Sequence, residues 1–284
     1  MKKLFRLVLL AITAVSAFSV FAADTAPVKP LEVGVVPYIS ARAVVTNFEP
    51  LRVYLERVLG QPVKIYTSTG FKQFYKNAER GDYDLVISAA HFARLLQKDN
   101  KFKPLVKLYP AAHSLLMTKL DSPLKTPMDL KGQVLAVPDQ LAFSSMVALA
   151  WLRENGLQPG VDFKILDVPS FPSALLAVQK GDANAAISAS PVIAQIPKEL
   201  RESLKTLADV GEFLQFIFLT HPRMELAASE RISKELLNFN NDTGEGKQFF
   251  NSTGFGAITA LAPKDMGSLD RYVAETKRLM EEAP

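Results

Sequence analysis

An internal repeat constrains the fold of this chain more than any other feature of its sequence. When residues 60–90 are laid over residues 160–190, nine of the 31 positions are identical. Each copy reads as a short strand, a polar turn, a helix that ends at a Gly-Asp pair, and an apolar strand that ends in Ser-Ala. The repeat favours two halves built on the same strand-helix-strand unit, although two unrelated units of similar build would also give such matches.

The strands of the repeat indicate which kind of sheet they form. The segments Asp84–Ile87 and Asn184–Ile187 are short and mostly apolar without alternation, which is typical of parallel strands buried on both faces. Open sheets of this kind bind their ligands in the crevice outside the carboxyl ends of the strands. The predicted class is therefore α/β, with a binding site at these strand ends.

Further elements extend both halves and suggest how the chain divides. The predicted elements are strands at Leu31–Val36 and Val134–Val137, helices at about 48–59 and 144–155, and extended hinge strands at Ala112–Lys119 and Gln215–Thr220. Beyond Pro222 the pattern is helical, at 229–237, 246–251 and 268–280, and this part is expected to pack on the first half. We expect lobe 1 to comprise 23–111 and 221–284, and lobe 2 to comprise 112–220.

The N-terminus has the pattern of a secretory signal peptide. Three basic residues within the first six precede an apolar run, Leu7–Val20, and small residues follow around Ala22. The run is shorter than the roughly 20 residues that a membrane-spanning helix needs. We therefore expect a signal peptide over residues 1–22 that is cleaved after Ala22, and a periplasmic mature protein.

Removal of the signal peptide also removes most of the net charge. The chain has 33 basic and 29 acidic residues, and three of the basic ones lie within residues 1–22, which leaves 30 against 29. A nearly neutral chain gives no reason to expect nucleic-acid binding. Because it has no cysteine, it has no disulfide, no thiolate metal site and no acylated cysteine of a lipoprotein. We expect a soluble periplasmic monomer that is not a lipoprotein.

Several short motifs occur in an order and spacing that resemble a known family. They are VGVVPY at 33–38, GDYDLV at 81–86, DLKG at 129–132 and GDANAA at 181–186. Over about residues 31–280 the chain resembles the periplasmic phosphate, phosphite and phosphonate binding proteins of ABC transporters. The resemblance implies the type II periplasmic binding protein fold, in which two Rossmann-like lobes with parallel-type sheets are joined by two hinge strands.

Proteins of this family bind their ligands through loops at strand ends and through helix starts rich in Ser and Thr. Such positions suit an oxyanion, because a helix N-terminus offers unpaired N–H groups and about half a positive charge. The resemblance implies that the ligand-binding residues are Tyr38, Ser68, Thr69, Ser88, His91, Phe143, Ser144, Ser145, Ser170 and Ser188. Capping of the adjacent helix is an alternative role for Ser144 and Ser145, and simple packing is an alternative role for Tyr38.

The sequence departs from the family at two places that bear on the ligand. Many phosphonate-type members have Ser-Thr-Ser-Gly at a helix start of the second lobe, where this chain has Ala-Phe-Ser-Ser-Met at 142–146. Some members hold an amino group with carboxylates, whereas the matching positions at 170–171 and 188–190 are neutral here. An aminoalkylphosphonate is therefore not favoured, and other small oxyanions stay open.

The expected function is capture of a small oxyanion of phosphate, phosphite or phosphonate type, by hinge closure, for an ABC permease and ATPase. The alternative is a periplasmic component that senses an oxyanion and signals to a membrane sensor kinase. An enzyme is not expected, because the chain has no Gly-x-Ser-x-Gly elbow, no His-Glu-x-x-His and no full phosphate-binding loop. The three histidines, at 91, 113 and 221, are scattered, so neither a metal nor a cofactor is expected.

Overall fold

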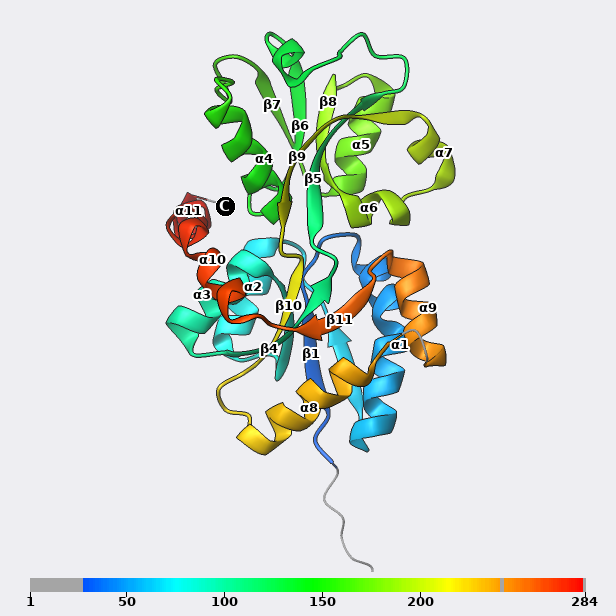
Figure 1. Ribbon diagram of the computed structural model, residues 1–284, viewed down its shortest axis with the longest axis vertical. Coiled ribbons are helices and arrows are strands. Elements are labelled where there is room, and N and C mark those ends of the chain that lie inside the picture. The colour runs from blue at the N-terminus through cyan, green and yellow to red at the C-terminus, as the bar shows by residue number, and fades with distance from the viewer. Residues whose placement is uncertain (1–27, 241–242, 283–284) are drawn as a thin grey trace, which may run out of the picture.

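Two α/β lobes, one stacked on the other, make up the computed structural model (Figure 1). It describes residues 28–240 and 243–282, so the predicted signal peptide at 1–22 lies outside the described residues. The strands of lobe 1 are β1 (Leu31–Val35), β2 (Val63–Tyr66), β3 (Leu85–Ala89), β4 (Lys103–Tyr109), β10 (Phe216–Thr220) and β11 (Ala257–Ala260). Its helices are α1 (Ala41–Leu59), α2 (Phe71–Arg80), α3 (Ala90–Asn100), α8 (Leu226–Asn238), α9 (Gly244–Thr253), α10 (Pro263–Ser268) and α11 (Asp270–Glu282).

Lobe 2 is built in the same way around a second sheet. Its strands are β5 (Ala112–Lys119), β6 (Val134–Pro138), β7 (Lys164–Val168), β8 (Ala185–Ala189) and β9 (Leu204–Phe213). Its helices are the 3-10 turn η1 (Pro127–Leu130), α4 (Phe143–Glu154), α5 (Phe171–Lys180), α6 (Ser190–Gln195) and α7 (Lys198–Glu202). The strand order is β11-β4-β10-β3-β1-β2 in the first sheet and β7-β6-β8-β5-β9 in the second. The predicted α/β class with two lobes is confirmed.

The repeat found in the sequence corresponds to equivalent units in the two lobes. The helices α2 and α5 begin and end one hundred residues apart, and so do the strands β3 and β8. Both helices end at a glycine in the left-handed region, Gly81 with φ 83° and Gly181 with φ 90°, where a residue without a Cβ is favoured. In each lobe a parallel strand, β1 or β6, pairs with both strands of the unit.

The two sheets are mixed, because antiparallel strands extend the parallel centres. β3 and β8 are buried along their whole length, as their apolar sequences predict. β10 and β11 pair antiparallel in the first sheet, and β5 and β9 do so in the second. The sequence did not reveal β4, β9 or β11, because their buried and exposed positions follow no continuous apolar run.

The chain crosses between the lobes twice, at 110–111 and at 214–215. The first crossing joins β4 to β5, and the second joins β9 to β10. We predicted that Gln215–Thr220 belongs to lobe 2, but β10 pairs with β3 and β4 and lies inside the first sheet. The reason is its composition: Ile217, Phe218 and Leu219 are fully buried, and only a central strand buries both faces.

Helices of the C-terminal part cover lobe 1. α9 contacts α1, α8 contacts β4 and β11, and α11 contacts α3; Figure 1 shows α11 at the level where the lobes meet. α1 begins at Ala41 rather than near 48, because the side chain of Ser40 caps it by accepting from the Ala43 N–H. Within the described part of the chain, no helix combines the length and apolarity needed to cross a bilayer.

Candidate functional site

A small cavity lies between the lobes, at the ends of the central strands. Its volume is about 40 Å³, and residues of both sheets line it. Ala89 ends β3 and Ala189 ends β8, so the cavity lies at the carboxyl ends where the fold class predicts a ligand site. Ala142 and Ser144 bring the beginning of α4 to the same place. The cavity is therefore the candidate ligand site.

Aromatic rings form a large part of the cavity wall. The lining includes Tyr38, Phe71, Phe143, Phe171, Phe213, Phe216 and Phe255. The Tyr38 ring packs edge-on against Phe216, with 5.0 Å between ring centroids, and Phe143 packs edge-on against Phe213 at 5.3 Å. Such edge-to-face pairs fix the rings against one another, which gives the cavity a firm, apolar wall.

Ser144 supplies a polar group that has no partner in the protein. Its side chain is 1% exposed and lines the cavity, and its Oγ makes no hydrogen bond. A buried hydroxyl without a partner costs free energy unless a ligand or water satisfies it. No side chain caps α4, whose N-cap residue is Ala142, so the first-turn N–H groups of this helix are also available.

Ser145 does not share this arrangement. Its Oγ is fully buried and donates to the carbonyl of Pro138 at 2.7 Å, which ties α4 to the end of β6. Both serines were expected to contact the ligand. The structure places Ser144 at the cavity, whereas Ser145 forms a hydrogen bond within the protein.

His91 lies beside the cavity wall and bridges the lobes. Its ring packs at an interplanar angle of 34° against both Phe92 and Phe143, with centroid distances of 4.1 and 4.6 Å. Nε2 donates to the carbonyl of Leu141 at 3.1 Å, and Nδ1 has no partner. Complete burial lowers the pKa of His91 to about 3, so the ring is neutral and Nδ1 can only accept a hydrogen bond.

Tyr38 lines the cavity as expected, with its hydroxyl directed to lobe 2. The hydroxyl donates to Oε1 of Gln195 at 3.1 Å. Burial raises the pKa of Tyr38 well above its usual value, although hydrogen bonds with Asn47 and Gln195 oppose the effect. The phenol therefore stays neutral and acts as a wall and as a contact between the lobes.

The remaining predicted residues lie outside the cavity lining. Ser68 Oγ contacts the Tyr83 hydroxyl at 3.3 Å, and Ser88 Oγ donates to the Ala89 carbonyl at 3.3 Å. Ser170 caps α5 by accepting from the Ser173 N–H. Ser188 is fully buried, and its Oγ has no partner.

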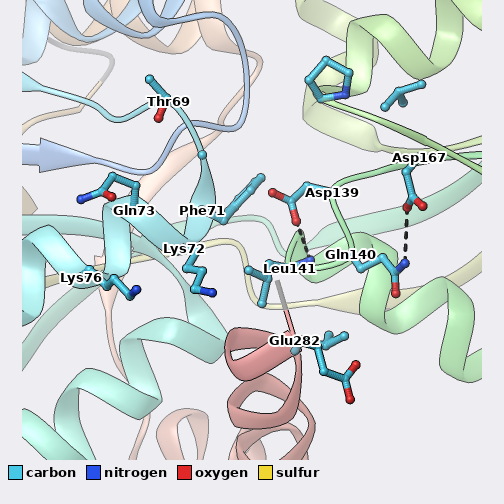
Figure 2. Close-up of a pocket in the computed structure, with 14 residues that line it drawn as sticks. Thr69, Phe71, Lys72, Gln73, Lys76, Asp139, Gln140, Leu141, Asp167 and Glu282 are labelled. Atoms are coloured by element: carbon cyan, nitrogen blue, oxygen red, sulfur yellow. Dashed lines mark hydrogen bonds between the residues drawn. The ribbon is translucent and has the colours of Figure 1, made fainter. Parts of the chain in front are cut away.

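A larger groove of about 820 Å³ adjoins the cavity at Phe71 (Figure 2). Phe71 lines both spaces. Lobe 1 contributes Lys72, Gln73 and Lys76 of α2, together with Thr69, which was expected at the site. Lobe 2 contributes Asp139, Gln140 and Asp167, and Glu282 of α11 lies at the edge. Cations and carboxylates therefore face one another across the groove.

The acidic side of the groove is organised by hydrogen bonds. Gln140 Nε2 donates to Asp167 Oδ1 at 3.3 Å, and the Leu141 N–H donates to Asp139 Oδ1 at 2.9 Å (Figure 2). Burial raises the pKa of Asp139; the hydrogen bond from Leu141 opposes this effect, and the nearby charge of Asp167 adds to it. Asp139 precedes α4 in the chain and lines the groove that adjoins the candidate site.

Gln195, a residue that no sequence pattern singled out, joins the lobes on the other side of the cavity. It lies at the end of α6, and its Oε1 accepts from the Tyr38 hydroxyl and from Asn47 Nδ2 at 2.9 Å. Its Nε2 donates to the carbonyl of Thr253 at 2.8 Å. Tyr38, Asn47 and Thr253 belong to lobe 1, so one amide from lobe 2 makes three hydrogen bonds across the interface.

No constellation for metal binding accompanies this site. Within residues 28–240 and 243–282, no group of three or more His, Cys, Asp or Glu side chains could hold a metal ion. Among the described residues, the cavity offers a ligand the unpartnered Ser144 hydroxyl, the helix-start amides and an apolar surface, because the Tyr38 hydroxyl and the Gln215 amide already have partners.

Comparison with known proteins agrees with this description. A family model described as "ABC transporter, phosphonate, periplasmic substrate-binding protein" matches residues 33–266. A Prochlorococcus marinus protein, PhnD1, solved in complex with methylphosphonate, is 16% identical with a TM-score of 0.77, over 89% of this chain and 99% of that one. A binding protein component of a phosphonate ABC transporter from Pseudomonas aeruginosa is 13% identical with a TM-score of 0.73, over 90% and 99% of the two chains.

A sulphonate-binding protein has a similar fold. The periplasmic aliphatic sulphonate binding protein SsuA from Escherichia coli is 14% identical with a TM-score of 0.65, over 90% of this chain and 94% of that one. At these identities the structural similarity shows the fold. The predicted type II periplasmic binding protein fold is thereby confirmed.

Proposed function

The chain belongs to the periplasmic substrate-binding proteins of phosphonate ABC transporters, and we propose that it captures a small oxyanion between its lobes for delivery to an ABC importer. The family and the fold are those of binding proteins rather than enzymes. Export through the signal peptide at 1–22, with cleavage after Ala22, is part of the proposal.

The observation that carries the proposal is the environment of Ser144. A buried hydroxyl without a partner lies at the uncapped start of α4 and lines the cavity between the lobes. An oxyanion would accept from this hydroxyl and from first-turn N–H groups, and it would lie in the positive field of the helix N-terminus. Hydrogen bonds to a charged group contribute about 1.5 to 3 kcal/mol each. A few of them suffice for micromolar binding after the cost of association.

Closure of the lobes would remove the anion from water. The two crossings at 110–111 and 214–215 are the short connections about which the lobes would rotate. The hydrogen bonds of His91 and Gln195 hold the lobes together in the arrangement described. A closed, ligand-filled form is the form that a permease would recognise.

Calorimetry on the mature protein tests the ligand class. Phosphate, phosphite, methylphosphonate and methanesulfonate are titrated separately at the same ionic strength. We expect at least one of them to bind and to raise the melting temperature, since a ligand that binds only the folded state stabilises it. If none of the four produces heat or a thermal shift, the proposed oxyanion function is wrong.

A further inference from the structure

The cavity lining narrows the class of oxyanion, an inference that rests on the proposed function. We infer that the ligand is a singly charged oxyanion with a short apolar substituent, of the alkanesulfonate kind. Inorganic sulfate and phosphate, doubly charged phosphonates and aminoalkyl oxyanions would be excluded.

The first reason is the absence of a countercharge. None of the described residues that line the cavity is Lys, Arg, Asp or Glu, and nearly all of them are aromatic or aliphatic. An ammonium group placed there would lose its water without gaining a carboxylate, and a second negative charge would lose its water without gaining a cation. An alkyl group, by contrast, gains from contact with the rings.

The second reason is the supply of hydrogen-bond donors. The Tyr38 hydroxyl already donates to Gln195, and the Gln215 side-chain amide already donates to the Pro110 carbonyl. Ser144 Oγ is the lining hydroxyl without a partner. The donors that remain for a ligand are therefore the Ser144 hydroxyl and the first-turn N–H groups of α4, which suit a single charged head group.

The third reason is the charge next to α4. The carboxylate of Asp139 accepts from the Leu141 N–H immediately before this helix. It therefore already uses part of the positive field at the helix start, and from the adjoining groove it would repel a doubly charged ligand more strongly than a singly charged one.

The size of the cavity sets the length of the substituent. Its volume of about 40 Å³ exceeds the roughly 10–15 Å³ that one water needs and is far below the roughly 150 Å³ of a cavity that takes benzene. The head group and its substituent share this space, so even a short alkyl chain would require the lobes to stand slightly further apart than they do here, and an aromatic ring is disfavoured more strongly.

The test compares ligands that differ in one feature. Ethanesulfonate, 2-aminoethanesulfonate, sulfate and phosphate are titrated calorimetrically near neutral pH at constant ionic strength. Ethanesulfonate and 2-aminoethanesulfonate share the head group and the chain, and only the second carries an ammonium. We expect ethanesulfonate to bind at least tenfold more tightly than the other three. Equal or tighter binding of 2-aminoethanesulfonate, sulfate or phosphate would overturn the inference.

A second arm varies the charge of one ligand. Methylphosphonate gains a proton as the pH falls from the weakly alkaline to the weakly acidic range, whereas ethanesulfonate keeps a single charge. We expect methylphosphonate to bind more tightly at the lower pH and ethanesulfonate to bind equally at both. Tyr38 and His91 stay neutral across this range, because burial raises the pKa of the first and lowers that of the second. The charged groups beside the site include Asp139, Asp167, Lys72 and Lys76 of the adjoining groove, and the ethanesulfonate titration controls for them.

The outcomes separate this inference from the proposed function. If phosphate, phosphite or methylphosphonate binds and the sulfonates do not, or if methylphosphonate binds no better at the lower pH, the inference fails while oxyanion capture stands. If no anion of either panel binds, both fail.

Discussion

Ser144 and Ser145 are neighbours in the sequence, yet the fold gives their hydroxyls different surroundings. Ser144 Oγ lines the cavity without a partner, whereas Ser145 Oγ donates to Pro138. The sequence predicted that a helix begins here and that serine oxygens lie near its start. It could not distinguish the two residues, because the direction of each side chain depends on how α4 packs against β6.

Replacing Ser144 by Ala tests its role as a ligand contact. We expect Ser144→Ala to weaken oxyanion binding about tenfold, equivalent to about 1.4 kcal/mol, with little loss of stability because the hydroxyl has no partner to lose. Ser145→Ala is the matched control. It should lower the free energy of unfolding by about 1 kcal/mol and affect affinity less. Unchanged affinity in Ser144→Ala, measured by calorimetry, would contradict the assignment.

His91 predicts a specific dependence of stability on pH. Burial lowers its pKa from 6.5 to about 3 in the folded protein, so below about pH 6.5 the unfolded chain binds a proton that the folded chain does not. The contribution of the neutral His91 ring to the free energy of unfolding is fully present above pH 6.5 and decreases as the pH falls toward 3. The slope approaches about 1.4 kcal/mol per pH unit.

Urea unfolding of the wild type and of His91→Gln isolates this effect from the titration of carboxylates. The difference in unfolding free energy between the two proteins should shrink by about 2 kcal/mol between near pH 7 and near pH 5. A difference that stays constant would mean that His91 takes up its proton in the folded state.

At the scale of elements, the sequence predicted the repeated units well and the antiparallel additions poorly. The helices α2 and α5 end at Gly81 and Gly181, residues whose left-handed backbone marks the boundary in the sequence itself. β9 and β11 have no such signal, because each forms only by pairing with a strand distant in the sequence. The sequence predicted that β10 is extended but assigned it to the wrong lobe, because its place in the first sheet is set by pairing with β3 and β4, which no local pattern specifies.

The short helix α6 gives a prediction of its own, through Gln195. Gln195→Ala removes three hydrogen bonds between the lobes, each worth about 0.5 to 1.5 kcal/mol, without altering the cavity lining. Ligand affinity should therefore fall about tenfold. Gln179→Ala, at an exposed position of α5 in the same lobe, is the control and should bind as the wild type does. Equal affinities of both variants would show that the amide does not stabilise the closed form.

At the scale of the whole molecule, the repeat predicted two lobes, but their interface could not be foreseen. Phe213, Phe216 and Phe255 come from segments without any motif. Phe216 and Phe255 pack against Tyr38 within lobe 1, and Phe213 of lobe 2 shares the cavity wall with them only because the lobes close on one another. The apolar character of the cavity was missed for this reason. The sequence indicated the site only through the Ser and Thr residues at predicted helix starts.

Small-angle scattering tests the hinge. The ligand-free protein should have a larger radius of gyration than the one calculated from this structure, because open lobes rotate apart about 110–111 and 214–215. An anion that calorimetry shows to bind should reduce the radius to the calculated value. No change on binding would rule out closure as the mechanism.

The central claim is that an oxyanion binds between the lobes at the start of α4. A crystal structure of the mature protein grown with methylphosphonate in the weakly acidic range tests it most directly. We predict the phosphonate oxygens within hydrogen-bond distance of Ser144 Oγ and of the first-turn N–H groups of α4, with the methyl group against the aromatic rings. Methylphosphonate bound elsewhere, such as in the outer groove beside Lys76, with the cavity left without it, would contradict the claim.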